Sequence, residues 1–212
     1  ITSPYSGNLS AIKFFNNNVG YIGANTAILK TIDGGDTWIS IPTSTFSING
    51  FSFPNDTIGY FGAHNSIIAK TTNQGVDWVN HDPGVSPYAF LSVSFPTISI
   101  GYGVGSAGTI RKTTDGGTTW IIQNSGITSN LEEVYFFDAT SGICIGESGS
   151  IRRTNNGGSN WLLVNSGTSA HLHDIHFVNS STGFIAGSEG TILKTTDGGA
   201  SWTSLTSGTT EW

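Results

Sequence analysis

Histidines gather in residues 171–176 of this 212-residue chain. If this segment is a strand, His171 and His173 share one face, and Asp174 and His176 share the other, because side chains alternate along a strand. Two imidazoles spaced in this way can bind zinc when another segment supplies a third ligand. A polar loop that enters a strand explains the same residues, and we expect neither a metal ion nor another cofactor.

The elements that position these side chains are set by a motif that occurs five times, Thr-x-(Asp/Asn)-x-Gly-x-x-Trp. Its tryptophans lie 40, 42, 41 and 41 residues apart, and such a fixed period indicates a repeat architecture. A unit of about 41 residues buries too little apolar surface to fold alone, so the repeats must pack on one another. The key motif residues are Asp33, Asn73, Asp115, Asn156 and Asp197, with Trp38, Trp78, Trp120, Trp161 and Trp202.

We expect this motif to be structural. A short Asp or Asn side chain accepts hydrogen bonds from turn N–H groups. The glycine two residues later supplies a positive φ, and the tryptophan packs between neighbouring sheets. Asn replaces Asp in two of the five copies, which a hydrogen-bonding role tolerates and a catalytic carboxylate would not.

Each repeat contains four short apolar segments separated by polar turns. Alternating apolar residues, such as Val134 and Phe136, predict the first strand. The second strand starts at a glycine such as Gly183, the third is marked by an isoleucine such as Ile192, and the fourth begins at the motif tryptophan. Four-stranded antiparallel units repeated radially predict an all-β fold, a β-propeller with five blades.

The repeats fill the chain as one domain, 1–212. They are expected at 9–47, 48–88, 89–129, 130–170 and 171–212. Residues 1–8 match the fourth strand of a repeat, so we expect an extra partial strand there. A ring of five has no place for that strand, so a fragment of a six- to eight-bladed ring is the alternative. The extra strand can also pair with a neighbouring molecule, which would give self-association.

The repeat resembles known families. Thr-Thr-Asp-Gly-Gly-Thr-Thr-Trp, residues 113–120, resembles the Asp-box, or BNR repeat. The longer unit, which runs from Gly-Tyr through Gly-Ser-Ala-Gly-Thr-Ile-Arg-Lys to this motif, is similar to the repeats of photosystem II assembly-factor-like (YCF48-like) proteins. The resemblance implies a β-propeller with the motif at its outer turns. It does not choose a function, because the Asp-box occurs in sialidases, xyloglucanases, sortilin-type receptors and assembly factors alike.

Composition excludes several classes of function. The chain has 14 acidic and 8 basic residues, and this balance argues against a nucleic-acid partner. No apolar run is long enough to form a transmembrane segment. The lone cysteine, Cys144, lies between isoleucines and is expected to be a small buried hydrophobe. The polar, lysine-poor surface favours an extracytoplasmic protein, which would be secreted, periplasmic or on the cell surface.

We expect the binding site at one mouth of the central channel, where loops crowd together. This mouth should combine the loops between repeats, the first residues of each first strand, and the turns between second and third strands. The residues at these positions are Glu132, Glu133, His171, His173, Asp174, Glu147, Glu189 and His64, with Tyr88 and Phe90 as aromatic surface. The function predicted is a non-enzymatic binding or scaffold and assembly propeller that recognises a protein or other partner through these loops.

Two other functions are open. A glycan-binding, lectin-like propeller would repeat a polar and aromatic site in each blade, whereas the loops of this chain differ. A glycoside hydrolase would use a carboxylate pair at the mouth, with Glu133 or Asp174 as a member. A sialidase would need three arginines that converge on a carboxylate, but Arg111, Arg152 and Arg153 all lie in third strands.

Overall fold

The computed structural model of the chain describes residues 3–43, 47–81 and 89–209. Within these ranges the chain forms five antiparallel sheets, each with four strands that follow one another in the sequence. We call each sheet a blade and its strands a, b, c and d in chain order. The predicted all-β propeller with five blades is confirmed.

The strand bounds follow the repeats. The first blade contains β1 (Leu9–Phe14), β2 (Gly20–Ala24), β3 (Ala27–Thr31) and β4 (Ile39–Pro42), and the second contains β5 (Ile48–Ser52), β6 (Gly59–Ala63), β7 (Ile67–Thr71) and β8 (Val79–His81). The third contains β9 (Phe90–Ser94), β10 (Gly101–Gly105), β11 (Ile110–Thr113) and β12 (Ile121–Gln123). The fourth contains β13 (Leu131–Phe136), β14 (Gly142–Gly146), β15 (Ile151–Thr154) and β16 (Leu162–Leu163), and the fifth contains β17 (Leu172–Phe177), β18 (Gly183–Gly187), β19 (Ile192–Thr195) and β20 (Thr203–Leu205). Two 3-10 turns, η1 (Ser106–Gly108) and η2 (Glu147–Gly149), join strands b and c in the third and fourth blades.

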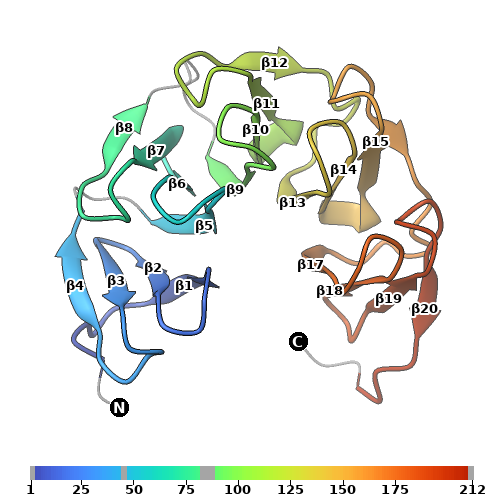
Figure 1. Cartoon of the computed structure of the whole chain (residues 1–212). Helices are drawn as coiled ribbons and strands as arrows, with labels where there is room; N and C mark the ends of the chain where they lie inside the picture. Colours follow the sequence, from blue (N-terminus) through green and yellow to red (C-terminus); the bar gives the residue numbers. More distant parts are fainter. Residues whose placement is uncertain (1–2, 44–46, 82–88, 210–212) are drawn as a thin grey trace.

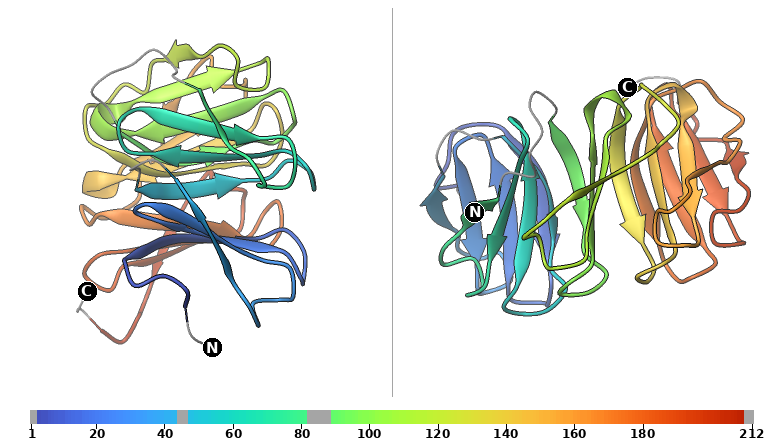
Figure 2. Two further views of the ribbon diagram at one scale, coloured as in Figure 1. Left: turned by 90° about the vertical axis from the view of Figure 1, so that its left-hand side faces the viewer. Right: turned by 90° about the horizontal axis from the view of Figure 1, so that it is seen from above.

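The blades stand side by side around a central channel, which their a strands line (Figure 1). Contacts join the a strands in series, β1 with β5, β5 with β9, β9 with β13 and β13 with β17. Neighbouring sheets face each other, as the view from above shows (Figure 2). The first and last blades stand apart, so the blades form an open arc (Figure 1).

The core lies between blades, where rings stack on rings. Phe95 of the third blade lies over Tyr60 of the second, with ring centroids 3.4 Å apart and planes within 2°. Gly101 makes room for the same phenylalanine, because a Cβ at this position would lie 2.2 Å from the Phe95 ring. This explains the glycine at the start of each b strand. Cys144 is buried in the next such cluster, as predicted.

The Trp motif forms the c–d turn. In the third blade the hydroxyl of Thr113 donates to Asp115 Oδ1 (2.8 Å) and accepts from Gly117 N (2.9 Å), and the same oxygen of Asp115 accepts from Thr119 N (2.8 Å). Gly117 has a φ of 88°, in the region that favours glycine. Trp120 Nε1 donates to Gly117 O (3.2 Å). The predicted structural role of the turn therefore has a direct hydrogen-bond basis.

The N-terminal segment departs from the prediction. Residues 3–8 form no strand, so the expected extra strand is absent from the part of residues 1–8 that the structure describes. Tyr5 instead shares a hydrogen bond of 3.1 Å with Thr26 Oγ1, beside the start of β3. The segment therefore runs along a turn of the first blade.

No helix in the described ranges is long and apolar enough to cross a membrane. The helical residues are confined to the two short turns between strands b and c.

Replacing Asp115 with Asn should remove a source of acid sensitivity. Hydrogen bonds from Thr119 and Thr113 lower the pKa of this carboxyl to about 2. A carboxyl with a lowered pKa stabilises the fold above its unfolded pKa, and this contribution is lost as pH falls from about 4 to about 2. We therefore expect the thermal midpoint of the parent chain to fall more steeply over this range than that of Asp115→Asn. The matched control is Asp36→Asn, since no described group donates a hydrogen bond to the Asp36 carboxylate. If the thermal midpoints of Asp115→Asn and of the parent chain fall in parallel as the pH is lowered, the prediction is contradicted.

Candidate functional site

The channel is a concave feature lined by residues of all five blades. It has a volume of about 640 Å³. Every a strand has a β-bulge near its start, where its register with strand b shifts by one residue. Bulges re-aim side chains and occur often beside functional sites. The extra residues, which all line the channel, are Ser10, Asn49, Leu91, Glu132 and His173.

The bulge changes how the histidine segment is presented. Leu172 and Ile175 are both buried, whereas His173 and Asp174 between them are both exposed. The strict alternation assumed for this strand is therefore interrupted. The rings of His171 and His173 have centroids 6.3 Å apart.

The three kinds of segment expected at one mouth do meet there. Backbone hydrogen bonds tie the b–c turns of the second to fifth blades to the residue just before the a strand. Glu147 N donates to Asn130 O (3.0 Å), Ser188 N donates to His171 O (2.8 Å), and His64 N donates to Ser47 O (3.2 Å). The b–c turns and the strand starts therefore form one end of the channel.

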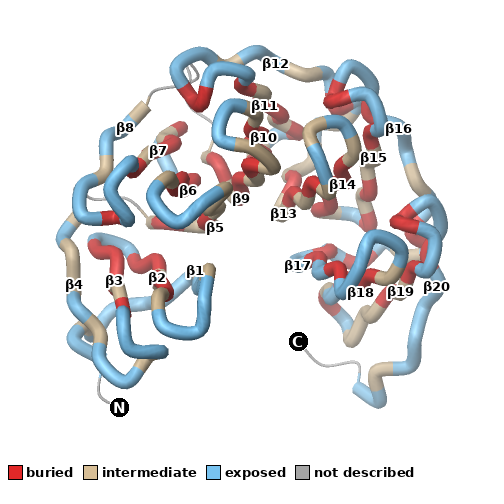
Figure 3. Tube along the Cα trace, in the orientation of Figure 1, coloured by how far each residue is buried: buried red, intermediate tan, exposed pale blue. Residues whose placement is uncertain are grey.

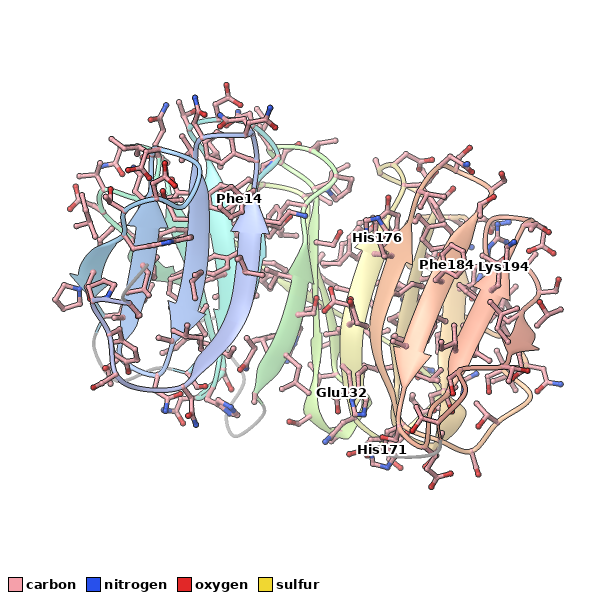
Figure 4. The ribbon with its side chains drawn as sticks, turned by 90° about the horizontal axis from the view of Figure 1, so that it is seen from below. Phe14, Glu132, His171, His176, Phe184 and Lys194 are labelled. Atoms are coloured by element: carbon pink, nitrogen blue, oxygen red, sulfur yellow. The ribbon has the colours of Figure 1, made fainter. Side chains whose placement is uncertain are left out.

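Four side chains of the fourth and fifth blades make up what we call the mouth cluster, namely Glu132, Glu147, His171 and His173. Burial raises the pKa of Glu132, the charge of Glu147 raises it further, and the two histidines oppose the rise. Glu132 and His171 lie at the same end of their blades, whereas His176 lies toward the other end (Figure 4). The cluster thus combines carboxylates that repel each other with histidines that can neutralise them.

Neighbouring polar groups hold two members of the mouth cluster. The Glu147 carboxylate accepts hydrogen bonds from Asn130 N (3.1 Å) and Asn130 Nδ2 (3.0 Å). His173 Nε2 lies 2.8 Å from Ser188 Oγ. These contacts fix the b–c turns of the fourth and fifth blades against the starts of their a strands.

Glu133 lies deeper in the channel wall and is part-buried. Its carboxylate accepts a hydrogen bond from Ser92 Oγ of the neighbouring blade (2.7 Å). Burial raises the pKa of Glu133 to about 7, against the hydrogen bond from Ser92, and the charge of Asp174 adds to the rise. Lys13, across the channel on β1, lowers it slightly. Glu133 and Asp174 therefore line the same channel close enough to influence each other.

The remaining predicted residues differ in their positions. Phe90 is wholly buried in the core between blades, so the prediction that it adds aromatic surface at the mouth is wrong. Its position at the start of β9 corresponds to Leu131 and Leu172, which are core residues. His64 and Glu189 are exposed on b–c turns of the second and fifth blades. Tyr88 lies outside the described residues.

Within the described ranges, no group of three or more His, Cys, Asp or Glu side chains is arranged to hold a metal ion. His171 and His176 lie toward opposite ends of β17 (Figure 4). The histidines of this strand therefore do not converge.

Glu133 should make stability depend on pH in the opposite sense to the turn aspartates. A carboxyl whose folded pKa is raised from 4.5 to about 7 favours folding at low pH, and this contribution is lost as pH rises through that window. We expect Glu133→Gln to raise the thermal midpoint relative to the parent chain at about pH 8 and much less at about pH 4. Ser92→Ala should move the Glu133 titration to a still higher pH, measured by NMR. If the thermal midpoints of the parent chain and of Glu133→Gln differ by the same amount at all pH values, this account is contradicted.

One family model matches the end of the chain. Residues 153–211 match the family model described as "Photosynthesis system II assembly factor YCF48". No curated protein sequence matches the chain significantly. The YCF48-like resemblance of the repeats is therefore confirmed where the model matches, in the fifth blade and the end of the fourth.

Solved structures share the fold. A structure titled "YCF48 bound to D1 peptide" is 20% identical, covers 96% of this chain and 82% of its own, and has a TM-score of 0.54. YCF48 from Cyanidioschyzon merolae is 16% identical, covers 96% of this chain and 86% of its own, and has a TM-score of 0.53. The GH74 enzyme of Niastella koreensis is 19% identical with a TM-score of 0.75 over 92% of this chain, which spans only 38% of that enzyme. At these identities the likeness shows a propeller fold.

Proposed function

We propose that this chain is a non-enzymatic binding or scaffold propeller that recognises an extended, basic segment of a protein partner at the mouth of its channel. The observation that carries the proposal is the gathering of carboxylates on one side of the channel. Glu132, Glu133, Glu147 and Asp174 all belong to the fourth and fifth blades. Among the described residues that line the channel, Lys13 on the first blade is the only lysine or arginine.

The chemistry suits lysine and arginine side chains. The burial that raises the pKa of Glu132 and Glu133 also lowers the local dielectric, so an ammonium or guanidinium group interacts more strongly there than at an open surface. A bound cation would in turn lower both pKa values and favour the charged carboxylates. The YCF48 structure that holds a D1 peptide supports a peptide as the ligand class for a propeller of this kind.

We also propose that the protein works outside the cytoplasm. The support is its composition, which has 29 glycines, 8 basic residues and a single cysteine. That cysteine is wholly buried, and burial raises the pKa of its thiol above the ordinary range, so it is inert toward oxidants. Fractionation of cells that express the full gene would test the location, and recovery with cytoplasmic markers would overturn it.

A glycoside hydrolase is the second candidate function. Glu133 and Asp174 line one channel, and a carboxyl whose pKa is about 7 is suited to the role of a general acid. The GH74 neighbours share the fold. Release of reducing sugar from xyloglucan that disappears in Glu133→Gln would replace the binding proposal with this one. A lectin-like function has weaker support, because the channel residues differ from blade to blade.

The experiment that tests the binding proposal is a screen of synthetic extended peptides graded from acidic to basic. We expect the basic peptides to bind, with affinity that falls as salt rises, because exposed charge attraction is screened by ions. Binding that is indifferent to peptide charge and to salt would overturn the proposal.

A further inference from the structure

The four interfaces between blades use one repeated contact. A strand b residue that directly follows the glycine packs against a phenylalanine of the next blade that ends strand a or directly follows it, and we call this ring the strand a phenylalanine. The pairs are Tyr21 with Phe53, Tyr60 with Phe95, Tyr102 with Phe136 and Ile143 with Phe177. Opposite the strand b residue, on strand c, stands a cation. These cations donate to a c–d turn carbonyl of the next blade, Lys30 to Gln74 O (2.6 Å), Lys70 to Gly116 O (2.8 Å), Lys112 to Gly157 O (2.7 Å) and Arg153 to Gly198 O (3.3 Å).

The last blade carries the strand b and strand c residues of this contact, but none of the other described blades packs against them. Phe184 follows the glycine of β18 and pairs with Lys194 across the sheet. The Lys194 ammonium lies 5.8 Å from the centroid of the Phe184 ring, as the lysines of the first three blades lie over their tyrosines. Among the described residues, no carbonyl accepts a hydrogen bond from Lys194. We call these two residues the aromatic–lysine face (Figure 4).

The first blade carries the other two features of this contact, the phenylalanine of strand a and the carbonyl of the c–d turn. Phe14 holds the position of Phe95 and Phe136, and its ring lies edge-on to Trp38 as theirs lie to Trp120 and Trp161. Phe14 is 37% exposed, whereas Phe95 and Phe136 are 4% and 7% exposed. Ile12 on the same strand is 64% exposed, and every residue of β1 except the half-buried Ala11 is exposed (Figure 3). Ile12, Phe14 and the carbonyl of Gly34 form the phenylalanine face.

We propose that the aromatic–lysine face is a docking surface for a further blade of this repeat type, which supplies a strand a phenylalanine and a c–d turn carbonyl. Continuity with the four internal interfaces identifies the occupant, since each internal blade meets the same pair of groups with those two features. An aromatic ring stacked on a ring contributes beyond its buried area, and a lysine that a neighbouring blade partly buries needs an acceptor.

The test adds one blade to the full chain. A copy of residues 131–171 is fused after residue 212, so that copies of Phe136 and Gly157 can meet Phe184 and Lys194. Stability of repeat arrays rises with each added interface, so we expect the thermal midpoint to rise by about 5 °C. Hydrogen exchange should also slow at β18 and β19.

Matched controls isolate the docking contact. The control carries Phe184→Ser and Lys194→Met. With these two substitutions, the chain with the added blade should have the same thermal midpoint as the chain without it. An added blade that leaves exchange at β18 and β19 unchanged would overturn the proposal, as would an equal gain in the control fusion. Concentration-dependent protection of Phe184 in the unextended chain, abolished by Phe14→Ser, would assign the faces to a second copy and would also overturn it.

Discussion

Truncation of Tyr60 to Ala is expected to lower the free energy of unfolding by about 3–5 kcal/mol, the cost of removing a buried aromatic ring. Tyr60 has no exposed surface and stacks on Phe95 at the interface of the second and third blades. Its hydroxyl donates to Gly116 O (3.1 Å), so the ring and the c–d turn of the next blade are held together. Burial raises the pKa of Tyr60 to about 12, which keeps the hydroxyl protonated as a donor.

The matched control for this prediction is Tyr60→Phe. It keeps the stacked ring and removes only the hydroxyl, whose single hydrogen lies within reach of Gly116 O and Ile98 O, so it should cost about 1 kcal/mol. Lys70 still donates to Gly116 O in that variant, so the carbonyl keeps a partner. Chemical denaturation of the parent chain, Tyr60→Ala and Tyr60→Phe measures both losses in the free energy of unfolding. Equal losses for the two variants would show that the hydroxyl, and not the ring, holds the blades together.

Charge reversal at the mouth should have the largest effect on binding. In Glu132→Lys with Asp174→Lys, a basic peptide would meet like charges, and such a juxtaposition costs several kcal/mol. We expect the affinity for the best basic peptide of the screen to fall by about 100-fold, which corresponds to about 2.7 kcal/mol. Calorimetric titration measures both affinities.

The matched control reverses two carboxylates at the other end of the blades. Asp36 and Asp56 are exposed and lie in a c–d turn and an a–b turn. Asp36→Lys with Asp56→Lys changes the net charge by the same amount, so it should weaken binding only slightly. An equal loss in both double variants would mean that net charge, and not the mouth, decides the affinity.

The blades could be predicted from the sequence because the repeat fixes local structure five times over. Each glycine at a strand b start and each Trp motif marks a position that backbone geometry restricts, as the φ of 88° at Gly117 shows. The N-terminal segment was mispredicted by the same logic. Residues 1–8 match a repeat in sequence, but a strand also needs a neighbouring edge to pair with. Residues 3–8 form no strand and run along a turn of the first blade.

The candidate site was only partly predictable. The carboxylates and histidines were identified because they differ between otherwise similar repeats. The bulges were missed, although two adjacent polar residues between apolar ones, as in 131–134, signal a break in alternation. Phe90 was misplaced because its exposure depends on the facing blade, where it packs near Ile68 in one core cluster. The open flank of the last blade could not be predicted from the repeat, since Phe184 and Lys194 are the same kinds of residue, an aromatic and a lysine, as Tyr60 and Lys70 of an internal interface.

Hydrogen exchange in the presence of a bound basic peptide tests the central claim most directly, because it locates the partner on the molecule. We predict that exchange slows in residues 130–133, 147–149 and 171–174, which carry the mouth cluster, Glu133 and Asp174, and stays unchanged in the c–d turns. Protection confined to the c–d turns or to the outer d strands, with the mouth unchanged, would contradict the assignment of the channel mouth as the binding site.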